Sequence, residues 1–342
     1  MKAMILEALG PMTQNPLPLR LAILPDPSPG PGEILVRVLT SGVCHTELDE
    51  IEGRIPPPFL PMVLGHQVVG RVEEMGEGST RFQPGDRVGV AWIFDACGDC
   101  FHCTTGNENL CPSFRATGRD VHGGYAEYLT VPEAFAFSIP DVFSDAEAAP
   151  LLCAGAIGYR SFSLTHLENG QPLGLTGFGA SGHLVLKMVR HVCPDTEVFV
   201  FARSEAEQRF ALELGASWSG DTADRAPQPL AAIIDTTPVW KPVVEGLRNL
   251  APGGRLVVNA IRKEEHDKDV LLDLDYAADL WMEREIKSVA NVTRSDVTNF
   301  LDLAGKIPIR PDVLEFPLEE ANIALQELKN RQIRGAKVLR IS

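Results

Sequence analysis

Four cysteines within a stretch of fifteen residues dictate the local structure around them more firmly than any other feature of the sequence. They have the spacing C-x2-C-x2-C-x7-C within AWIFDACGDCFHCTTGNENLCPS. Four thiolates this close suit a tetrahedral Zn²⁺, which can close a lobe that has little hydrophobic core of its own. Four protein ligands leave no open position, so we expect a structural zinc held by Cys97, Cys100, Cys103 and Cys111.

Two other uses of these cysteines are alternatives to zinc. Four cysteines can also hold an iron–sulfur cluster, but the bacterial ferredoxin spacing is C-x2-C-x2-C-x3-C-P, and the last gap is longer here. Reduced, buried thiols are the second alternative, and they would require this clustering to arise by accident. The spacing therefore favours zinc.

Composition and the N-terminal segment narrow the classes of function. The chain has 342 residues, more than one hydrophobic core usually serves, so we expect two domains. Its 31 Lys and Arg against 46 Asp and Glu give a net charge of −15, which disfavours nucleic acid and anionic lipid as partners. The N-terminal residues are broken by Gly10 and several prolines, unlike a signal peptide, and no segment reaches membrane-spanning length. We expect a cytoplasmic protein with reduced cysteines.

The chain has two parts with different patterns of apolar residues and turn signals. Up to about residue 150, short apolar runs alternate with Gly and Pro turn signals, which predicts a mainly β domain. Beyond that point apolar strands alternate with helical stretches, as in βαβ units. A helical pattern and a last strand, AKVLRIS, follow residue 288. We therefore predict an α/β fold with a mainly β domain of residues 1–152 and 289–342, a doubly wound parallel sheet in residues 153–288, and a cleft between them.

A glycine fingerprint lies between an apolar strand and a helical stretch, in LGLTGFGASG. In this G-x-G-x-x-G pattern Gly177 makes the tight turn, Gly179 lets the backbone approach a pyrophosphate, and Gly182 lets the helix pack on the strand. The helix N-terminus adds N–H donors and the positive end of its dipole. A flexible turn without a ligand is the alternative, but the strand–turn–helix context favours a Rossmann dinucleotide site.

The next strand, VFVFARSEAEQ, bears on the choice of dinucleotide. An acidic residue about 20 residues beyond the last glycine normally binds the adenosine ribose, and Ala202 stands at that place. Arg203 and Ser204 follow, a cation and a hydroxyl suited to a 2′-phosphate, so we predict that NADP is favoured over NAD. Arg203 as a solvated charge, or stacked on adenine, is the alternative.

Two more cysteines and a histidine lie outside the cysteine lobe. They are Cys44 in SGVCHTELDE, His66 in PMVLGHQVVGRV and Cys153 in APLLCAGAIGY. A Cys2His set with water in the fourth position would be an open, catalytic zinc site. Each residue taken singly is more often part of a packed core, and sequence separation alone does not bring the three together.

In their order along the chain these motifs resemble those of the medium-chain, zinc-dependent alcohol dehydrogenases. The matching segments are GVCHTEL, PMVLGHQVVGRVEEMGEG, QPGDRVGVAW, the cysteine lobe, GGYAEY, APLLCAGAIGYR, GFGASG and LEEANIALQELKNRQIRGAKVL. The resemblance implies a GroES-like catalytic domain that contains two zinc sites and an inserted Rossmann domain. It also implies reversible oxidation of primary or secondary alcohols to aldehydes or ketones with hydride transfer to NAD(P), in a homodimer or homotetramer.

The same resemblance assigns roles to individual residues. Cys44, His66 and Cys153 would bind the catalytic zinc. Thr46 matches the hydroxyl that bonds the zinc-bound oxygen and begins a proton relay, with helix capping as its alternative. His45 matches a residue that reaches the cofactor pyrophosphate, with an exposed loop histidine as the alternative.

Five positions depart from the family pattern. Gln67 replaces the glutamate usual after the ligand histidine, and Glu47 stands where an aspartate commonly orients that histidine. Asp49 stands at the end of the proton relay in place of a histidine; a surface aspartate with an ordinary pKa of about 3.9 is a poor base, so bulk water is the alternative. Ile157 replaces a threonine near the nicotinamide, and Ile55 replaces a large aromatic, which favours substrates bulkier than ethanol.

Two rival functions share part of this pattern. A zinc-free, NADPH-dependent quinone or enone reductase would have the same architecture without the three catalytic ligands. A non-enzymatic, zinc-stabilised dinucleotide-binding regulator would keep the cysteine lobe and the glycine turn only. The presence of Cys44, His66, Cys153 and Thr46 together favours the dehydrogenase.

Overall fold

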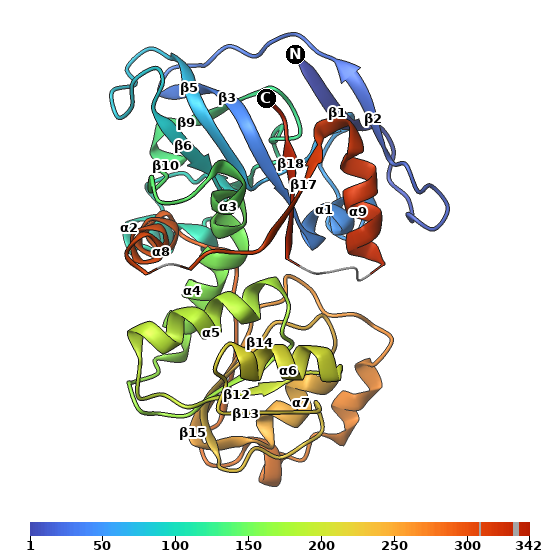
Figure 1. Cartoon of the computed structure of the whole chain (residues 1–342), viewed down its shortest axis with the longest axis vertical. Helices are drawn as coiled ribbons and strands as arrows, with labels where there is room; N and C mark the ends of the chain where they lie inside the picture. Colours follow the sequence, from blue (N-terminus) through green and yellow to red (C-terminus); the bar gives the residue numbers. More distant parts are fainter. Residues whose placement is uncertain (308, 331–334) are drawn as a thin grey trace. The chain divides into compact units, whose positions relative to one another are not determined.

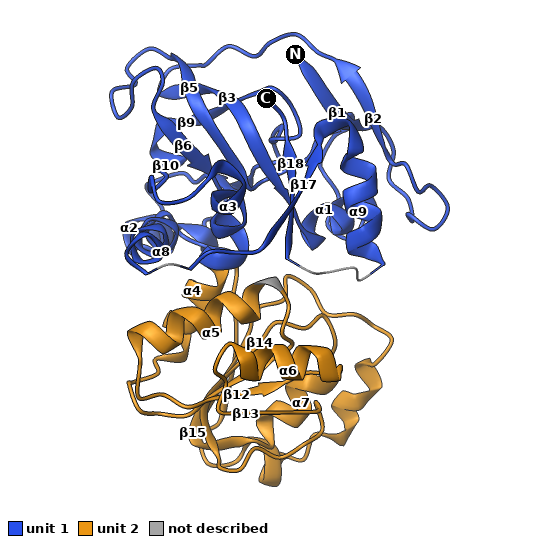
Figure 2. Ribbon diagram, viewed as in Figure 1, with its two compact units in different colours: residues 1–156, 291–342 blue, residues 157–290 orange. Residues whose placement is uncertain are grey.

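The computed structural model describes residues 1–307, 309–330 and 335–342. The chain forms two compact units, of which unit 1 comprises residues 1–156 and 291–342 and unit 2 comprises residues 157–290 (Figure 2).

The predicted boundary after residue 152 differs from this division, because Cys153 lies in unit 1. The reason is local packing. Cys153 belongs to a π-helical turn, Leu151–Gly155, and a Cβ on Gly155 would collide with the ring of Phe300 in helix α8 (Arg294–Lys306) of the same unit.

Unit 1 is built mainly from β strands around β3 (Glu33–Val43) (Figure 1). The strand order of its larger sheet is β10-β6-β5-β3-β18-β17, and β9 also pairs with β3. The last strand of the chain, β18, runs antiparallel to β3, so the C-terminus returns to the sheet of the N-terminal part. The other strands of this sheet are β5 (Val68–Met75), β6 (Arg87–Val90), β9 (Tyr128–Pro132), β10 (Ala136–Ser138), β17 (Val313–Pro317) and β18 (Ala336–Arg340).

A second sheet of unit 1 anchors the helix that follows β3. Its strand order is β2-β1-β4, with bounds Leu19–Ile23, Lys2–Leu6 and Met62–Val63. Apolar side chains of this sheet form one core with Leu48 and Ile51 of α1 (His45–Ile51) and with α9 (Ala321–Lys329). Residues 331–334, in the C-terminal helical pattern and the last family segment, lie outside the described residues.

The remaining elements of unit 1 are short. They are β7 (Ile93–Asp95), α2 (Phe101–Thr104), a 3₁₀ turn (Glu108–Leu110), β8 (Arg115–Ala116), a 3₁₀ turn (Glu133–Phe135), α3 (Asp145–Pro150) and a 3₁₀ turn (Leu318–Glu320).

Unit 2 is a parallel sheet with the strand order β13-β12-β11-β14-β15-β16. In order of appearance this is 3-2-1-4-5-6, the Rossmann arrangement, so the predicted doubly wound parallel sheet is confirmed. The strand order reverses between β11 and β14. The strands are β11 (Leu173–Thr176), β12 (Val198–Phe201), β13 (Trp218–Gly220), β14 (Leu230–Asp235), β15 (Leu250–Val258) and β16 (Glu285–Ser288).

Four α-helices of unit 2 connect or flank these strands within the described residues. In α5, Leu184, Val185, Met188 and Val189 recur at helical spacing and are all buried, which is the amphipathic pattern that packs a helix on a sheet. The helical segments are α4 (Ala156–Thr165), α5 (Ala180–Val192), α6 (Glu205–Glu213), α7 (Lys241–Leu247), a 3₁₀ segment (Lys268–Asp273) and a π-helical turn (Tyr276–Leu280). No helix in the described parts of the chain is long and apolar enough to cross a membrane.

Candidate active site

Three residues that lie far apart in the sequence meet in unit 1. The ligand atoms of Cys44, His66 and Cys153 all lie within 4.8 Å of one another. Nε2 of His66 is 3.4 Å from Sγ of Cys153. Two sulfurs and an imidazole nitrogen grouped in this way fit a tetrahedral Zn²⁺ that keeps its fourth position for water or substrate.

Each of the three is placed by a distinct backbone feature. Cys44 is the extended N-cap residue that joins β3 to α1. His66 follows Gly65, whose φ of 98° and contact with the Tyr125 ring exclude a side chain. Cys153 lies in the π-helical turn after α3, a conformation that is rare and often found at functional sites.

Glu47 fixes the orientation of the histidine. One carboxylate oxygen lies 2.6 Å from Nδ1 of His66, and both side chains are buried. The other oxygen accepts a hydrogen bond of 2.8 Å from the backbone N–H of Cys44. The longer side chain at position 47 therefore reaches the histidine, and Nε2 is left as the ring nitrogen that faces the sulfurs.

The mutual contacts of this group shift its protonation equilibria. The neighbouring Cys153 side chain, and then His66, lower the pKa of the Cys44 thiol well below its ordinary value, although burial opposes this. Burial lowers the pKa of His66, but the charges and hydrogen bonds of Glu47 and Cys44 together outweigh it and hold that pKa well above the ordinary value. A thiolate at Cys44 is the form that binds a metal ion.

Thr46 and Asp49, both assigned to a proton relay, lie in different surroundings. Oγ1 of Thr46 is 3.6 Å from Sγ of Cys44, so this hydroxyl borders the ligand group. The expected surface position of Asp49 is wrong, because its side chain is buried. Nε of Arg54 donates to Oδ1 of Asp49 at 2.5 Å, so a guanidinium already holds the carboxylate.

Glu50 is a buried carboxylate near the same group that the sequence reasoning missed. It lies one helical turn after Glu47 on α1, and among the described residues neither of its oxygens has a hydrogen-bond partner. Burial, and then the negative charge of Glu47, raise the pKa of Glu50 well above its ordinary value. The i, i+3 spacing of two glutamates in a helix was the available signal, but it does not reveal burial.

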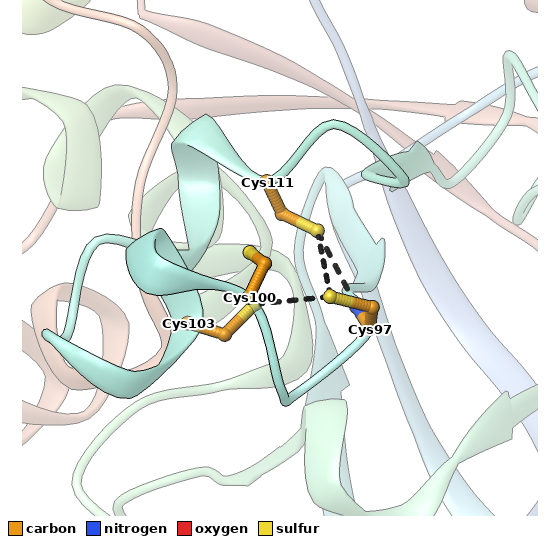
Figure 3. Close-up of side chains that lie close together, drawn as sticks. All are labelled: Cys97, Cys100, Cys103 and Cys111. Atoms are coloured by element: carbon orange, nitrogen blue, oxygen red, sulfur yellow. Dashed lines mark hydrogen bonds between the residues drawn. The ribbon is translucent and has the colours of Figure 1, made fainter.

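The four cysteines of the lobe point toward one another (Figure 3). Their sulfurs all lie within 4.8 Å, and Sγ of Cys97 is 3.4 Å from Sγ of Cys111 and 3.9 Å from Sγ of Cys103. Desolvation and the neighbouring thiols raise the pKa of Cys103 to about 12. A divalent cation would relieve the repulsion between four thiolates, so this lobe also fits a bound zinc.

The lobe is tied to another part of unit 1. Nε of Arg294, the first residue of α8, donates to Oε1 of Glu108 at 2.8 Å. The Arg294 guanidinium also lies 4.7 Å from the centre of the Phe135 ring. These contacts attach the lobe to the body of the unit, as a structural role requires.

The three fingerprint glycines have three different surroundings in unit 2. Gly177 has a φ of 77°, and a Cβ there would lie 2.8 Å from Oγ1 of Thr236. A Cβ on Gly182 would lie 2.8 Å from the carbonyl oxygen of Gly177, so the helix packs against the turn. A Cβ on Gly179 would meet nothing within 4 Å, which leaves open space where a pyrophosphate would approach.

The residues predicted for the adenosine end lie just beyond β12. Arg203 is exposed. Ser204 is the N-cap of α6: its Oγ accepts from the N–H of Glu207 at 3.2 Å and donates to that residue's carboxylate at 3.0 Å. His45, the first residue of α1 in unit 1, is exposed.

Comparisons with known proteins agree with this geometry. Residues 30–141 match the family model of the alcohol dehydrogenase GroES-like domain. The protein named "Probable alcohol dehydrogenase AdhA" from Mycobacterium tuberculosis is 43% identical over 97% of this chain and 95% of its own length. Among solved structures, an NAD-dependent alcohol dehydrogenase shares 26% identity over 100% of both chains with a TM-score of 0.87. A cinnamyl alcohol dehydrogenase from Sorghum bicolor shares 27% identity over 99% of this chain and 97% of that chain, with a TM-score of 0.81. The chain therefore belongs to the medium-chain, zinc-dependent alcohol dehydrogenase family.

Proposed function

We propose that this alcohol dehydrogenase holds a catalytic zinc at Cys44, His66 and Cys153 and transfers hydride between an alcohol carbon and a nicotinamide dinucleotide. The observation that carries the proposal is the convergence of these three ligand atoms within 4.8 Å. When bound there, zinc would act as a Lewis acid toward the alcohol oxygen. This ligand set and the alcohol dehydrogenase relatives argue against the metal-free reductase and the non-enzymatic regulator.

The protein residues would orient the ligands and handle the proton. Glu47 would keep Nε2 of His66 aimed at the two sulfurs. Thr46, whose hydroxyl borders Cys44, would accept the proton of the alcohol. Asp49 would take part in the relay only after release from Arg54, so Thr46 would pass the proton to bulk water instead.

Metal content tests this assignment directly. We propose two zinc ions per chain, one at Cys44, His66 and Cys153 and a structural one in the cysteine lobe. Cys44→Ser is expected to lose one zinc and alcohol oxidation together. A Cys44→Ser protein that retained both zinc ions and full activity would overturn the catalytic assignment, and one zinc in the native protein would favour either rival function.

NADP is proposed as the preferred cofactor, with support from the end of β12. Ala202 offers no carboxylate to an adenosine ribose, and Arg203 is exposed. Arg203→Ala is expected to raise the KM for NADP by about 10- to 100-fold, since a charge-assisted contact with phosphate contributes about 1.5–3 kcal/mol. The KM for NAD should change little. Arg209→Ala, an exposed arginine on α6, is the matched control; equal effects on both cofactors would exclude a 2′-phosphate contact.

Self-association into a homodimer or homotetramer is also proposed. Strand β16 forms the edge of the parallel sheet, and all four of its residues are exposed. Its Ile286 is an exposed apolar side chain, and so are Tyr276, Trp281 and Met282, which precede it in the sequence. An uncovered edge strand with exposed apolar side chains is the kind of surface that pairs with another chain.

A reducing, cytoplasmic location completes the proposal, because it would keep the metal-binding thiols reduced. The physiological alcohol is best sought with a panel of primary alcohols, secondary alcohols and aldehydes. Both cofactors and the metal content should be measured on the same sample.

A further inference from the structure

Unit 2 contains a buried ion pair at the reversal of its strand order. Asp235, the last residue of β14, is fully buried, and the side chain of Lys263 is 8% exposed. Asp235 lies opposite Thr176, the last residue of β11, and Oγ1 of Thr176 donates to its Oδ1 at 2.6 Å. Open α/β sheets bind ligands outside the carboxyl ends of the strands at this switch point. The sequence reasoning assigned no role to either member of the pair.

The Lys263 ammonium has no donor left for a ligand. It donates to Oδ2 of Asp235, to the carbonyl of Thr237 at 2.8 Å and to the carbonyl of Val239 at 3.0 Å. These three acceptors use all three N–H groups of a lysine. Oδ1 of Asp235 accepts in turn from the Thr237 hydroxyl at 2.8 Å. The ammonium therefore links segments of the chain and has no N–H group left to donate to a ligand.

Further hydrogen bonds join the segment after β15 to the segment after β14. The N–H of Glu264 donates to the carbonyl of Pro238 at 2.7 Å. Oδ2 of Asp267 accepts from the N–H groups of Trp240 and Lys241 at 2.8 and 2.9 Å. The segments 236–241 and 259–267 are therefore held together as one surface. The buried side chain of Lys263 joins the second segment to the first.

The surface formed by segments 236–241 and 259–267 is continuous with the glycine turn. Oγ1 of Thr236 donates to the carbonyl of Thr176 at 3.0 Å and is 3.3 Å from that of Gly177. Gly177 has no room for a side chain on the side of Thr236. The hydrogen bonds that start at Lys263 thus reach the turn on which a pyrophosphate would be bound.

The segments that Lys263 holds lie on the side of the sheet where one half of a dinucleotide would bind. The adenosine ribose is recognised at the end of β12, and the pyrophosphate lies at the start of α5. Strands β14 and β15 lie on the opposite side of β11 from β12. A dinucleotide laid across the crevice therefore places its nicotinamide half over the segments that Lys263 holds.

We propose that Lys263 is a positioning residue that, through Asp235, preforms the surface for the nicotinamide half of the cofactor. This inference rests on the proposed dinucleotide function. Stability alone is a poor explanation for the pair, because a buried ion pair often contributes no more than well-packed apolar residues would. A preformed surface, by contrast, lowers the ordering cost of binding.

The test compares a whole cofactor with its adenosine half. Dissociation constants are measured by fluorescence titration for NADPH and by calorimetry for 2′-phospho-ADP-ribose, with NADH and ADP-ribose in parallel. Lys263→Met is expected to weaken binding of the dinucleotides about tenfold, as the surface loses its order. Binding of the fragments, which lack nicotinamide, should change by less than about twofold.

Two companion variants keep this test decisive. Lys263→Met leaves Asp235 buried without a partner, so the double variant Lys263→Met with Asp235→Asn removes both charges and carries the same expectation if the single variant does not fold. Lys268→Met is the matched control, since it removes an exposed lysine directly after segment 259–267 that pairs only with Glu265 among the described residues; its binding should equal that of the native protein.

The outcomes separate this inference from the proposed function. Equal weakening of dinucleotide and fragment, or no weakening of either in a folded variant, would overturn the role of Lys263. If the native protein bound neither NADPH nor NADH, the proposed function itself would fail.

Discussion

Replacing Glu47 by glutamine should loosen the zinc proposed at Cys44, His66 and Cys153 without disturbing the one proposed in the cysteine lobe. In the native protein a carboxylate oxygen of Glu47 lies 2.6 Å from Nδ1 of His66, with exposed fractions of 0% and 1% for the two side chains. Glu47→Gln keeps the shape of the side chain and removes its charge. Loss of such a partner behind a ligand histidine typically lowers metal affinity 10- to 100-fold, which corresponds to about 1.4–2.7 kcal/mol.

The assay is zinc release to a chromogenic chelator at neutral pH. Native protein should release zinc in two phases, and Glu47→Gln should accelerate only the phase from the site of Cys44 and His66. The cysteine lobe has no contact with Glu47 in the described residues, so its phase is an internal reference. Glu73→Gln, an exposed glutamate, is the matched control.

An unchanged release rate in Glu47→Gln would refute the reasoning, because a charge 2.6 Å from the ring would then have no influence on the metal. Acceleration of both phases would point instead to general destabilisation of unit 1. Partial recovery with Glu47→Asp would support the orienting role, since the charge returns on a shorter side chain.

Three further predictions concern acid stability, cofactor binding and assembly. Burial raises the pKa of Glu52, but contacts with Lys329 and a neighbouring arginine outweigh it and lower that pKa to about 2. Glu52→Gln should therefore lower the free energy of unfolding, measured in urea at pH 7, by roughly 1–2 kcal/mol, allowing for solvent screening. This difference from the native protein should vanish as the pH falls from about 4.5 toward 2. Gly182→Ala places a Cβ 2.8 Å from the carbonyl oxygen of Gly177, so NADPH titrations should show affinity at least about tenfold lower, and unchanged affinity would mean that the turn yields freely. Ile286→Lys on the exposed edge strand should lower the mass found by sedimentation; a native mass would exclude β16 from the interface.

Features that are local in sequence were the ones that sequence reasoning could predict. The four lobe cysteines lie within fifteen residues, so two tight turns are enough to bring their sulfurs together. The glycine turn could be read for the same reason, because the strand, the turn and the helix are consecutive. The alternation of strands and helices predicted the parallel sheet, whose strand order the structure confirms.

The long-range arrangement could not be read from the residues themselves. Residue types and spacing made Cys44, His66 and Cys153 candidates, and only the family resemblance joined them into one ligand set. Asp49 appeared to be a surface residue because helix periodicity does not show that Arg54 folds over it. Burial is a property of everything packed against a side chain, and most of those neighbours come from elsewhere in the chain.

The sequence by itself determined which reactive groups are present: the thiols, the imidazole, the glycine turn, and Ala202 in place of a carboxylate directly after β12. The tertiary structure alone decided which groups act together, such as Glu47 with His66 and Asp235 with Lys263. The physical reason is the range over which each kind of interaction acts. Backbone turns act over a few residues, whereas contacts between side chains act over a few ångströms, and only the packed fold turns distance along the chain into proximity in space.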